Sequence, residues 1–310
     1  MLLEPREQTT MYFIGVTTKQ SSIMRIFPKW SEILGLDAVL EGYDAPLHAP
    51  PHVYQEIVER IKHDPLVKGA LVTTHKLDLV SATKHLFDEF DSYATLTQEV
   101  SSISKRGSRL IGHAKDPITS GLALQTFVPK NYWQNGAHVL CFGAGGAAVS
   151  ISLYLANQLG KEDRPRRFTV TDISEERLGH LQHIHEQLAT DVQFEYILNA
   201  DVKHNNKLVS NLPEGSLVIN ATGMGKDRPG SPITDRAIFP KNALVWELNY
   251  RGELDFLKQA KVQQELRHLH IEDGWVYFLH GWTQVMAEIF DFRLTPELFR
   301  ALDNAASQYR

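Results

Sequence analysis

The chain has 310 residues, of which 43% are hydrophobic and 22% are charged, and its formal net charge is -5. This length favours two compact units over one, and the composition is that of an ordinary globular protein. The negative charge argues against nucleic acid as the main partner, although a local basic pocket could still bind an acidic substrate. The single cysteine, Cys141, excludes an internal disulfide framework and is typical of a reducing compartment.

The sequence gives no sign of a leader or a membrane anchor. The first residues, MLLEPREQTT, lack the charge-then-apolar order of a signal peptide because Glu4, Pro5 and Arg6 come too early. Residues 139–156 are mostly apolar. The glycines near their start and the serines inside them favour a strand, a turn and a helix over a bilayer helix. We therefore predict a cytoplasmic protein with no membrane partner.

The first 115 residues alternate between strand-like and helix-like patterns. The helix predictions rest on apolar residues at helical spacing, such as Ile26, Trp30 and Ile33, and on Pro51, a favoured first-turn residue. Such alternation implies a parallel sheet with crossover helices. Two more β-rich runs flank Lys105–Gly107 and predict a hairpin. The predicted strands lie at 12–16, 37–45 and 69–73, and the predicted helices at 23–36, 51–61 and from 77 into the eighties.

A second alternating series follows residue 136. A helix predicted at about 118–127 is followed by Pro129 and Gly136, which mark a plausible boundary. The strand-like runs HVLCF, RFTVTD and VQFEYI then alternate with helices, and amphipathic helices are predicted at about 277–293 and 295–308. The sequence therefore predicts an α/β protein in which the second unit is a doubly wound parallel sheet.

A strand-like run that ends at Phe142 leads into a glycine-rich turn and then a helix. Glycine permits the positive φ of a tight turn and lets the backbone approach a pyrophosphate, and the N–H groups at the helix start attract that anion. A lone G-x-G-x-x-A match is weak, but this one lies in a βαβ unit, which predicts a dinucleotide site; a purely structural turn is the alternative. The predicted contacts are Gly143, Ala144, Gly145, Gly146 and Ala147.

The acidic residue at the end of the next strand-like run bears on the choice of cofactor. Asp172 follows RFTVT and is placed to accept hydrogen bonds from ribose hydroxyls, where it would repel the 2′-phosphate of NADP. Arg166, Arg167 and Arg177 could still reach a phosphate, and a plain strand-end turn residue is the alternative for Asp172. We therefore predict NAD as the cofactor, with NADP less favoured.

Six short segments occur in an order and spacing that restrict which protein families the chain can resemble. They are Gly69–Lys76, similar to GxNVTxPxK but one residue shorter; Gly112–Asp116, similar to GxNTD; GAGGAA from Gly143; Asn220–Met224, similar to NxTxxGM; Glu247–Tyr250, similar to DxxY; and Gly274 at the head of the last helices. In these segments the chain resembles the shikimate/quinate dehydrogenase family of α/β oxidoreductases. The glycine loop alone occurs in many families, but the ordered set is far more specific.

The resemblance implies a division of the chain and a catalytic pair. It implies a substrate-binding domain at 1–116, a Rossmann-type NAD-binding domain at 117–272, and helices at 273–310 that pack back on the first domain. A lysine beside a carboxylate can exchange the proton of a hydroxyl. By resemblance Lys76 is the acid/base and Asp116 orients it across an interdomain cleft; a solvated surface charge is the alternative for each. The further cofactor contacts implied are Asn220, Thr222, Gly223 and Met224.

The positions that bind substrate in the family depart from its pattern. The paired serines fall near Ser21, with Ser22 as a substitute, an asparagine becomes Ser101, and a late glutamine aligns with His280. Thr73 is either the family's threonine, displaced by the shortened loop, or unrelated to it. Because such changes alter which hydroxyls can be paired, a different substrate or a loss of activity is expected. The implied substrate-binding set is Ser21, Ser22, Thr73, Ser101, Tyr250 and His280.

The sequence thus predicts an oxidoreductase that transfers a hydride between NAD and a hydroxyl carbon of a shikimate-like or other small polyhydroxy acid. Two further departures, Ala114 and Lys115, keep open a catalytically silent nucleotide- or metabolite-binding protein, and a dehydrogenase of amino or one-carbon compounds is a second alternative. A homodimer is possible. No metal is expected, since His180, His183 and His185 lie on a polar helix without ligand spacing and look solvated.

Overall fold

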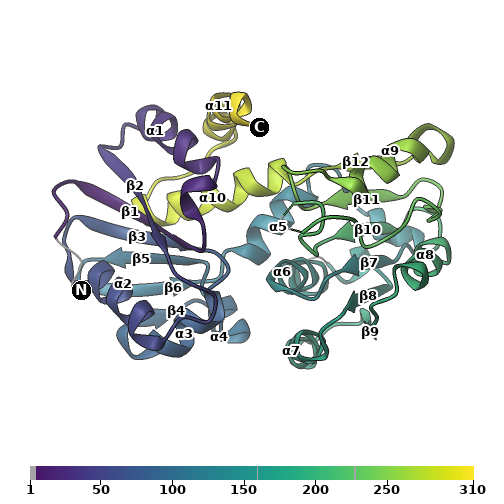
Figure 1. Ribbon diagram of the computed structural model, residues 1–310, viewed down its shortest axis with the longest axis horizontal. Coiled ribbons are helices and arrows are strands. Elements are labelled where there is room, and N and C mark those ends of the chain that lie inside the picture. The colour runs from purple at the N-terminus through teal and green to yellow at the C-terminus, as the bar shows by residue number, and fades with distance from the viewer. Residues whose placement is uncertain (1–4, 159, 227) are drawn as a thin grey trace. The chain divides into compact units, whose positions relative to one another are not determined.

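The computed structural model describes residues 5–158, 160–226 and 228–310 (Figure 1); residues 1–4 of the N-terminal segment, and residues 159 and 227, lie outside the described chain. The chain divides into two compact units, Met1–Lys115 with Gly281–Arg310, and Asp116–His280. Each unit has one six-stranded sheet covered by helices. The predicted α/β fold class is therefore confirmed, while the roles assigned to the two domains stay predictions.

The first unit has a mixed sheet. Its strands are β1 (Thr9–Gly15), β2 (Ala38–Asp44), β3 (Val67–Val72), β4 (Glu89–Phe90), β5 (Ser102–Arg106) and β6 (Arg109–His113), in the order β2-β1-β3-β5-β6-β4. The first three strands are parallel, and β5 and β6 form the predicted antiparallel hairpin beside β3. The two-residue β4 was not predicted, because so short an element has no detectable periodicity.

Helices cover this sheet. They are α1 (Ile23–Leu34), α2 (Pro51–His63), α3 (Lys76–Thr83), α4 (Ser92–Thr97), α11 (Pro296–Ala306) and the part of α10 (Trp275–Phe290) from Gly281 onward, with 3-10 turns at Thr18–Gln20, Lys84–Leu86 and Ser307–Tyr309. Helical spacing places Ile23, Ile26 and Trp30 on one buried face of α1, and Gly35, in the left-handed conformation, ends the helix. The Trp30 indole N–H donates to the Leu302 carbonyl at 2.7 Å and ties α1 to α11.

The second unit has a fully parallel sheet. Its strands are β7 (Val139–Phe142), β8 (Arg167–Asp172), β9 (Gln193–Leu198), β10 (Leu217–Asn220), β11 (Leu244–Glu247) and β12 (His270–Glu272), in the order β12-β11-β10-β7-β8-β9. The chain moves outward from β7 to β9 and then outward from β10 to β12 on the other side. The switch point therefore lies between β7 and β10, and ligands of doubly wound proteins bind at the carboxyl ends of the strands there.

Helices pack on both faces of this parallel sheet, as Figure 1 shows for α6 and α7 on one side and α8 and α9 on the other. They are α5 (Asp116–Leu124), α6 (Gly146–Leu153) with a π-helical end (Tyr154–Gln158), α7 (Glu175–His185), α8 (Val202–Ser210) and α9 (Asp255–Arg267), with 3-10 turns at Tyr132–Asn135 and Lys161–Asp163. Every residue of β7 is buried. Cys141 is thus a core thiol, and burial raises its pKa.

Candidate active site

The glycine-rich turn after β7 presents bare backbone at the switch point of the second unit. Gly143 has a φ of +98°, and a Cβ added to it would lie 2.7 Å from the Ala221 carbonyl oxygen, so only glycine fits. Around Gly145, in contrast, the position its Cβ would take is open space, with no described atom from beyond its chain neighbours within 4 Å. Gly145 also precedes α6 without a capping side chain, so the first N–H groups of the helix have no such partner. This backbone fits the pyrophosphate of a dinucleotide.

Asp172, at the end of β8, braces the glycine turn from the neighbouring strand. One carboxylate oxygen accepts the Ala144 N–H at 2.7 Å, and the other accepts the Ser174 N–H at 2.9 Å. The side chain is buried, so its carboxylate helps to fix the path of the turn. Each oxygen keeps a further lone pair, and the contact of Asp172 with a ribose stays a prediction.

The segment Asn220–Met224 after β10, called here the Asn220–Met224 loop, is folded by its own side chains. The Asn220 amide oxygen accepts the N–H and the hydroxyl of Thr222 at 3.2 and 2.7 Å, and the Thr222 oxygen accepts the Met224 N–H at 3.1 Å. Gly223, with a φ of +73°, allows the turn between them. Asn220 and Thr222 were predicted as cofactor contacts; in this structure their side chains shape the loop.

Glu247, the last residue of β11, contacts this loop and was not predicted as a functional residue. One oxygen accepts the Asn220 side-chain amide at 2.7 Å, and the other accepts the N–H and the side-chain amide of Asn249 at 2.9 and 2.7 Å. The side chain is fully buried, and burial raises its pKa to about 7 although these hydrogen bonds lower it. A charged residue that ends an apolar strand near a switch point is the sequence signal that would have identified it.

In the first unit the carboxyl ends of β1 and β3 lie side by side. A Cβ added to Gly15 would lie 3.1 Å from both the Thr73 hydroxyl oxygen and the Thr18 methyl group. The Thr73 hydroxyl donates to the Ile14 carbonyl at 3.4 Å, and Lys76 follows as the first residue of α3. The structure therefore places Thr73 and Lys76 at a sheet edge of the kind that binds ligands in α/β proteins.

His75, directly before Lys76, is a buried histidine that the sequence reasoning missed. Its N–H donates to the Thr73 carbonyl in a tight turn in which Thr74 has a φ of +24°. Its Nδ1 lies 3.1 Å from the hydroxyl of Tyr54 on α2. The imidazole thus ties the turn that carries Lys76 to the helix behind it. Only its position next to a candidate catalytic residue could have drawn attention to it in the sequence.

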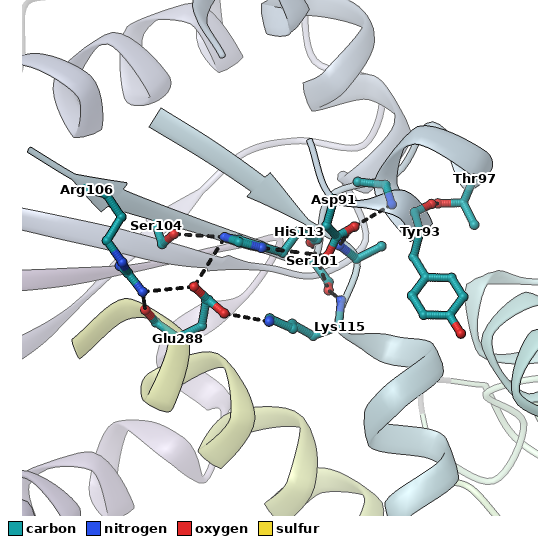
Figure 2. A network of polar contacts seen from close by, with 11 residues as sticks. Asp91, Tyr93, Thr97, Ser101, Ser104, Arg106, His113, Lys115 and Glu288 are labelled. Carbon is teal, nitrogen blue, oxygen red and sulfur yellow. Dashed lines mark hydrogen bonds and ion pairs between the residues drawn. The ribbon is translucent and has the colours of Figure 1, made fainter. Parts of the chain in front are cut away.

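The segment that leads into Asp116 is held by a polar network at the end of β6 (Figure 2). The Ser101 hydroxyl oxygen accepts the Lys115 N–H at 2.9 Å, and the Asp91 carboxylate accepts the Ala114 N–H at 3.2 Å. Asp91, which also caps α4, was not predicted as a site residue. Ser101 was predicted to bind substrate; its hydroxyl holds the backbone of this segment.

Glu288 of α10 completes this network. Figure 2 shows its carboxylate between Lys115 and Arg106, at 2.6 Å from the Lys115 Nζ and 2.9 Å from the Arg106 guanidinium. Burial raises the pKa of Glu288, but the charges of Lys115, His113 and Arg106 and the hydrogen bond from Lys115 outweigh burial and hold the pKa below its ordinary value. Lys115, a departure from the family pattern, therefore has a partner within its own unit.

The remaining predicted substrate residues belong to both units. Ser21 is half-buried and Ser22 is buried just before α1, where its side chain makes no capping bond. In the second unit Tyr250 packs against Phe278, with ring centroids 4.7 Å apart. His280 is buried, and burial lowers its pKa to about 4, so its ring is neutral near pH 7. Their contacts with a substrate stay predictions.

Lys76 belongs to the first unit, whereas Asp116, the first residue of α5, belongs to the second. Their pairing as acid/base and orienting group therefore stays a prediction.

The expectation that the His180–His185 side chains are solvated was wrong for His185. This residue is buried, its two ring nitrogens lie 2.8 Å from the Tyr196 hydroxyl and 2.7 Å from the Ser152 hydroxyl, and burial lowers its pKa to about 3. Its partners lie on β9 and α6, beyond the reach of helix periodicity. In the part of the chain that the structure describes, no three metal-binding side chains converge, and no helix is long and apolar enough to cross a membrane.

Two streptococcal enzymes are among the curated proteins that show sequence similarity to this chain. The shikimate dehydrogenase (NADP(+)) of Streptococcus gordonii is 26% identical over 215 residues, which cover 67% of this chain and 68% of that protein. The shikimate dehydrogenase (NADP(+)) of Streptococcus thermophilus is 29% identical over 190 residues, which cover 57% and 58% of the respective chains. No family model matches the sequence.

Three dehydrogenase or reductase structures are among the solved structures that share the fold over nearly the whole chain. Quinate dehydrogenase from Corynebacterium glutamicum in complex with NAD has a TM-score of 0.75 and 18% identity, covering 97% of this chain and 99% of that one. Shikimate 5-dehydrogenase from Thermus thermophilus in complex with NADP(H) and shikimate has a TM-score of 0.71 and 19% identity, covering 98% and 100%. The ligand-free 5-ketofructose reductase of Gluconobacter has a TM-score of 0.71 and 19% identity, covering 96% and 99%.

Proposed function

We propose, from the premise that this chain is a divergent relative of the shikimate and quinate dehydrogenases, that it is an oxidoreductase using a nicotinamide dinucleotide. The ordered motifs predicted the relationship, and the sequence relatives together with the shared fold bear it out. The observation that carries the proposal is the bare backbone at Gly143 and Gly145, at the switch point of a parallel sheet. A pyrophosphate needs N–H groups and no intervening side chain, and this turn provides both.

The chain's own residues would handle the proton of the substrate hydroxyl. The bound nucleotide would supply the hydride acceptor or donor. Lys76 exchanges the hydroxyl proton, and Asp116 orients the lysine and hydrogen-bonds the hydroxyl. Two features of the first unit support this assignment: His75 anchors the turn before Lys76, and Ser101 holds the residue before Asp116.

We propose NAD as the preferred cofactor. Asp172 places a carboxylate at the end of β8, where an adenosine ribose lies in doubly wound dinucleotide sites and where a 2′-phosphate would be repelled. Its neighbour Ile173 is apolar and largely exposed, so it offers that phosphate no positive charge. The curated relatives are named for NADP(+), and the quinate dehydrogenase structure contains NAD. Calorimetric titration with NAD and NADP, on wild type and Asp172→Ala, tests the preference: the variant should bind NADP better relative to NAD.

We propose as substrate a small polyhydroxy compound other than shikimate itself. The side chain of Ala114 cannot donate or accept a hydrogen bond, and the polar groups of Ser101 and Lys115 are bonded within the protein. A site with fewer free donors and acceptors cannot pair every hydroxyl and the carboxylate of shikimate, and each unpaired group weakens binding. The structural neighbour named for 5-ketofructose indicates that a keto sugar belongs on the test panel beside cyclic acids.

The test is turnover with a substrate panel. Shikimate, quinate, smaller hydroxy acids and acyclic polyols or keto sugars are incubated with NAD or NADH, and absorbance of the reduced cofactor is followed. Lys76→Ala should abolish turnover while NAD affinity is retained. Lys84→Ala is the matched control, because this lysine is exposed and bonded only to the side chain of Gln98 among the described contacts.

A catalytically silent nucleotide-binding protein is the second candidate, favoured by the loss of the substrate-binding asparagines at Ser101 and Ala114. It predicts NAD binding without turnover on any panel member. If neither NAD nor NADP binds, both candidates fail.

A further inference from the structure

The buried carboxyl of Glu247 accepts several hydrogen bonds and, among the described contacts, donates none. Its two oxygens receive three N–H groups, one from Asn220 and two from Asn249, all between 2.7 and 2.9 Å. A protonated carboxyl would add a fourth hydrogen and lose a lone pair, and it would accept these three N–H groups more weakly than the charged carboxylate does. The geometry of this pocket therefore suits the ionised carboxylate.

The contacts of Glu247 run directly into the Asn220–Met224 loop. Asn220 has one side-chain orientation that satisfies both ends: its NH2 group donates to Glu247, and its oxygen accepts from Thr222. Turning the amide over would serve a protonated Glu247 but would present NH2 to the Thr222 N–H. Asn249 contributes a second link, since its side-chain amide also reaches the Met224 carbonyl at 3.2 Å. The state of one buried carboxyl is thus coupled to the shape of the whole loop.

We infer that Glu247 is a positioning residue for dinucleotide binding: its ionised carboxylate holds the Asn220–Met224 loop in the binding shape, and its protonation releases the loop. The inference rests on the proposed function, because it assigns a role to the loop only if a dinucleotide binds beside it. Burial raises the pKa of Glu247 to about 7, and Asp273, in the turn before α10, raises it further by its charge. The release therefore falls within the physiological pH range.

The first experiment needs no cofactor. Amide resonances of Thr222 and Met224 are followed by NMR as the pH is changed between about 5.5 and about 8.5. In wild type both should titrate with a midpoint near 7. In Glu247→Gln they should not titrate in this range, because the amide carries no charge and offers one acceptor oxygen where the carboxylate has two.

Two more variants test whether the titration depends on charges near Glu247 and not on charges elsewhere in the unit. Asp273→Asn removes a neighbouring negative charge and can keep an oxygen for the Trp275 N–H, so the midpoint should move to lower pH. It leaves all three donors to Glu247 in place and keeps the test valid even if Glu247→Gln folds poorly. Glu195→Gln, an exposed carboxylate on β9 of the same sheet, should leave the titration unchanged.

The second experiment measures NAD affinity by calorimetry. If only the ionised form binds, the dissociation constant should rise about tenfold between about pH 8 and about pH 6 in wild type. In Glu247→Gln it should be weak and nearly independent of pH. Amides of Thr222 and Met224 that stay fixed, or that titrate equally in Glu247→Gln, would overturn the inference, as would an NAD affinity that is flat across this range. If neither NAD nor NADP binds at any pH, the proposed function fails, and the amide titration still decides whether Glu247 controls the loop.

Discussion

The glycine turn of the second unit and the segment before Asp116 in the first unit are both short motifs, but they are held in place by different means. The turn owes its shape to the backbone of Gly143, which contacts the backbone of Ala221, and to one nearby carboxylate. The segment before Asp116 depends on side chains that come from distant parts of the sequence, such as Glu288. A turn whose shape depends on glycine backbone keeps its geometry when other parts of the sequence diverge. A segment held by side-chain contacts can change one residue at a time, and its binding properties change with those residues.

The largest combined effect on stability and on cofactor binding is expected from adding one methyl group to the glycine turn. Gly143→Ala combines a φ of +98° with a Cβ 2.7 Å from a carbonyl oxygen, so we expect a loss of about 2–3 kcal/mol in the free energy of unfolding together with loss of NAD binding. Urea unfolding and calorimetric NAD titration measure the two effects.

Gly145→Ala is the control that separates stability from binding. Gly145 has a φ of -79°, and its Cβ position is open, so stability should stay within about 1 kcal/mol of wild type. The added methyl would occupy the space assigned to the pyrophosphate, and NAD affinity should fall by about tenfold or more. Wild-type affinity in this variant would show that the pyrophosphate does not lie there.

Glu247 gives the second unit a pH dependence of stability that opposes the usual one. Its pKa rises from 4.5 to about 7 on folding, so the folded chain holds this proton more tightly than the unfolded chain. The stabilisation is fully present below about pH 4.5 and is lost as the pH rises to about 7, a change of about 3 kcal/mol. The difference in unfolding free energy between wild type and Glu247→Gln, measured by urea at several pH values, should fall by that amount. A constant difference would mean that this carboxyl does not titrate there.

Patterns of neighbouring residues predicted the elements whose conformation is set by residues close together in the sequence. The glycine turn was identified because strand, turn and helix follow one another, and the hairpin at Lys105–Gly107 was identified because two β-rich runs flank a turn. The residues that were missed have their partners far away in the sequence: Glu247 bonds to Asn220, 27 positions away, and Glu288 bonds to Lys115, 173 positions away. No periodicity in a single sequence encodes such pairs.

Polar residues were also predicted wrongly to be exposed where hydrogen bonds to distant residues offset the cost of burying them. His185 lies on a helix that reads as polar, yet hydrogen bonds to Tyr196 and Ser152 make its burial affordable. Ser101 shows the same limit at the candidate site, because its position matched a substrate-binding residue while its hydroxyl bonds to the backbone of Lys115.

The side-chain network of the first unit should respond to removal of its central carboxylate. The Glu288 and Lys115 side chains are 22% and 16% exposed, so their ion pair falls between a surface pair and a buried one. Glu288→Gln should lower the unfolding free energy by about 1–2 kcal/mol near pH 7. Because the folded-state pKa of Glu288 is depressed, this contribution should be lost as the pH falls through that lowered value. Glu32→Gln, which removes an exposed pair with Lys29, is the matched control and should leave stability unchanged.

The smallest effect distinguishes a substrate contact from a backbone support at Ser101. Ser101→Ala removes the acceptor of the Lys115 N–H, so we expect a loss of about 1 kcal/mol in the free energy of unfolding. Ser102→Ala is the adjacent control: its hydroxyl is buried and, within the described residues, has no hydrogen-bond partner, so its removal should be neutral or slightly stabilising. A substrate contact at Ser101 would instead raise the KM of an active panel substrate with no change in stability. Unfolding curves and KM values for the two alanine variants therefore decide whether this position binds substrate or only supports the segment that leads into Asp116.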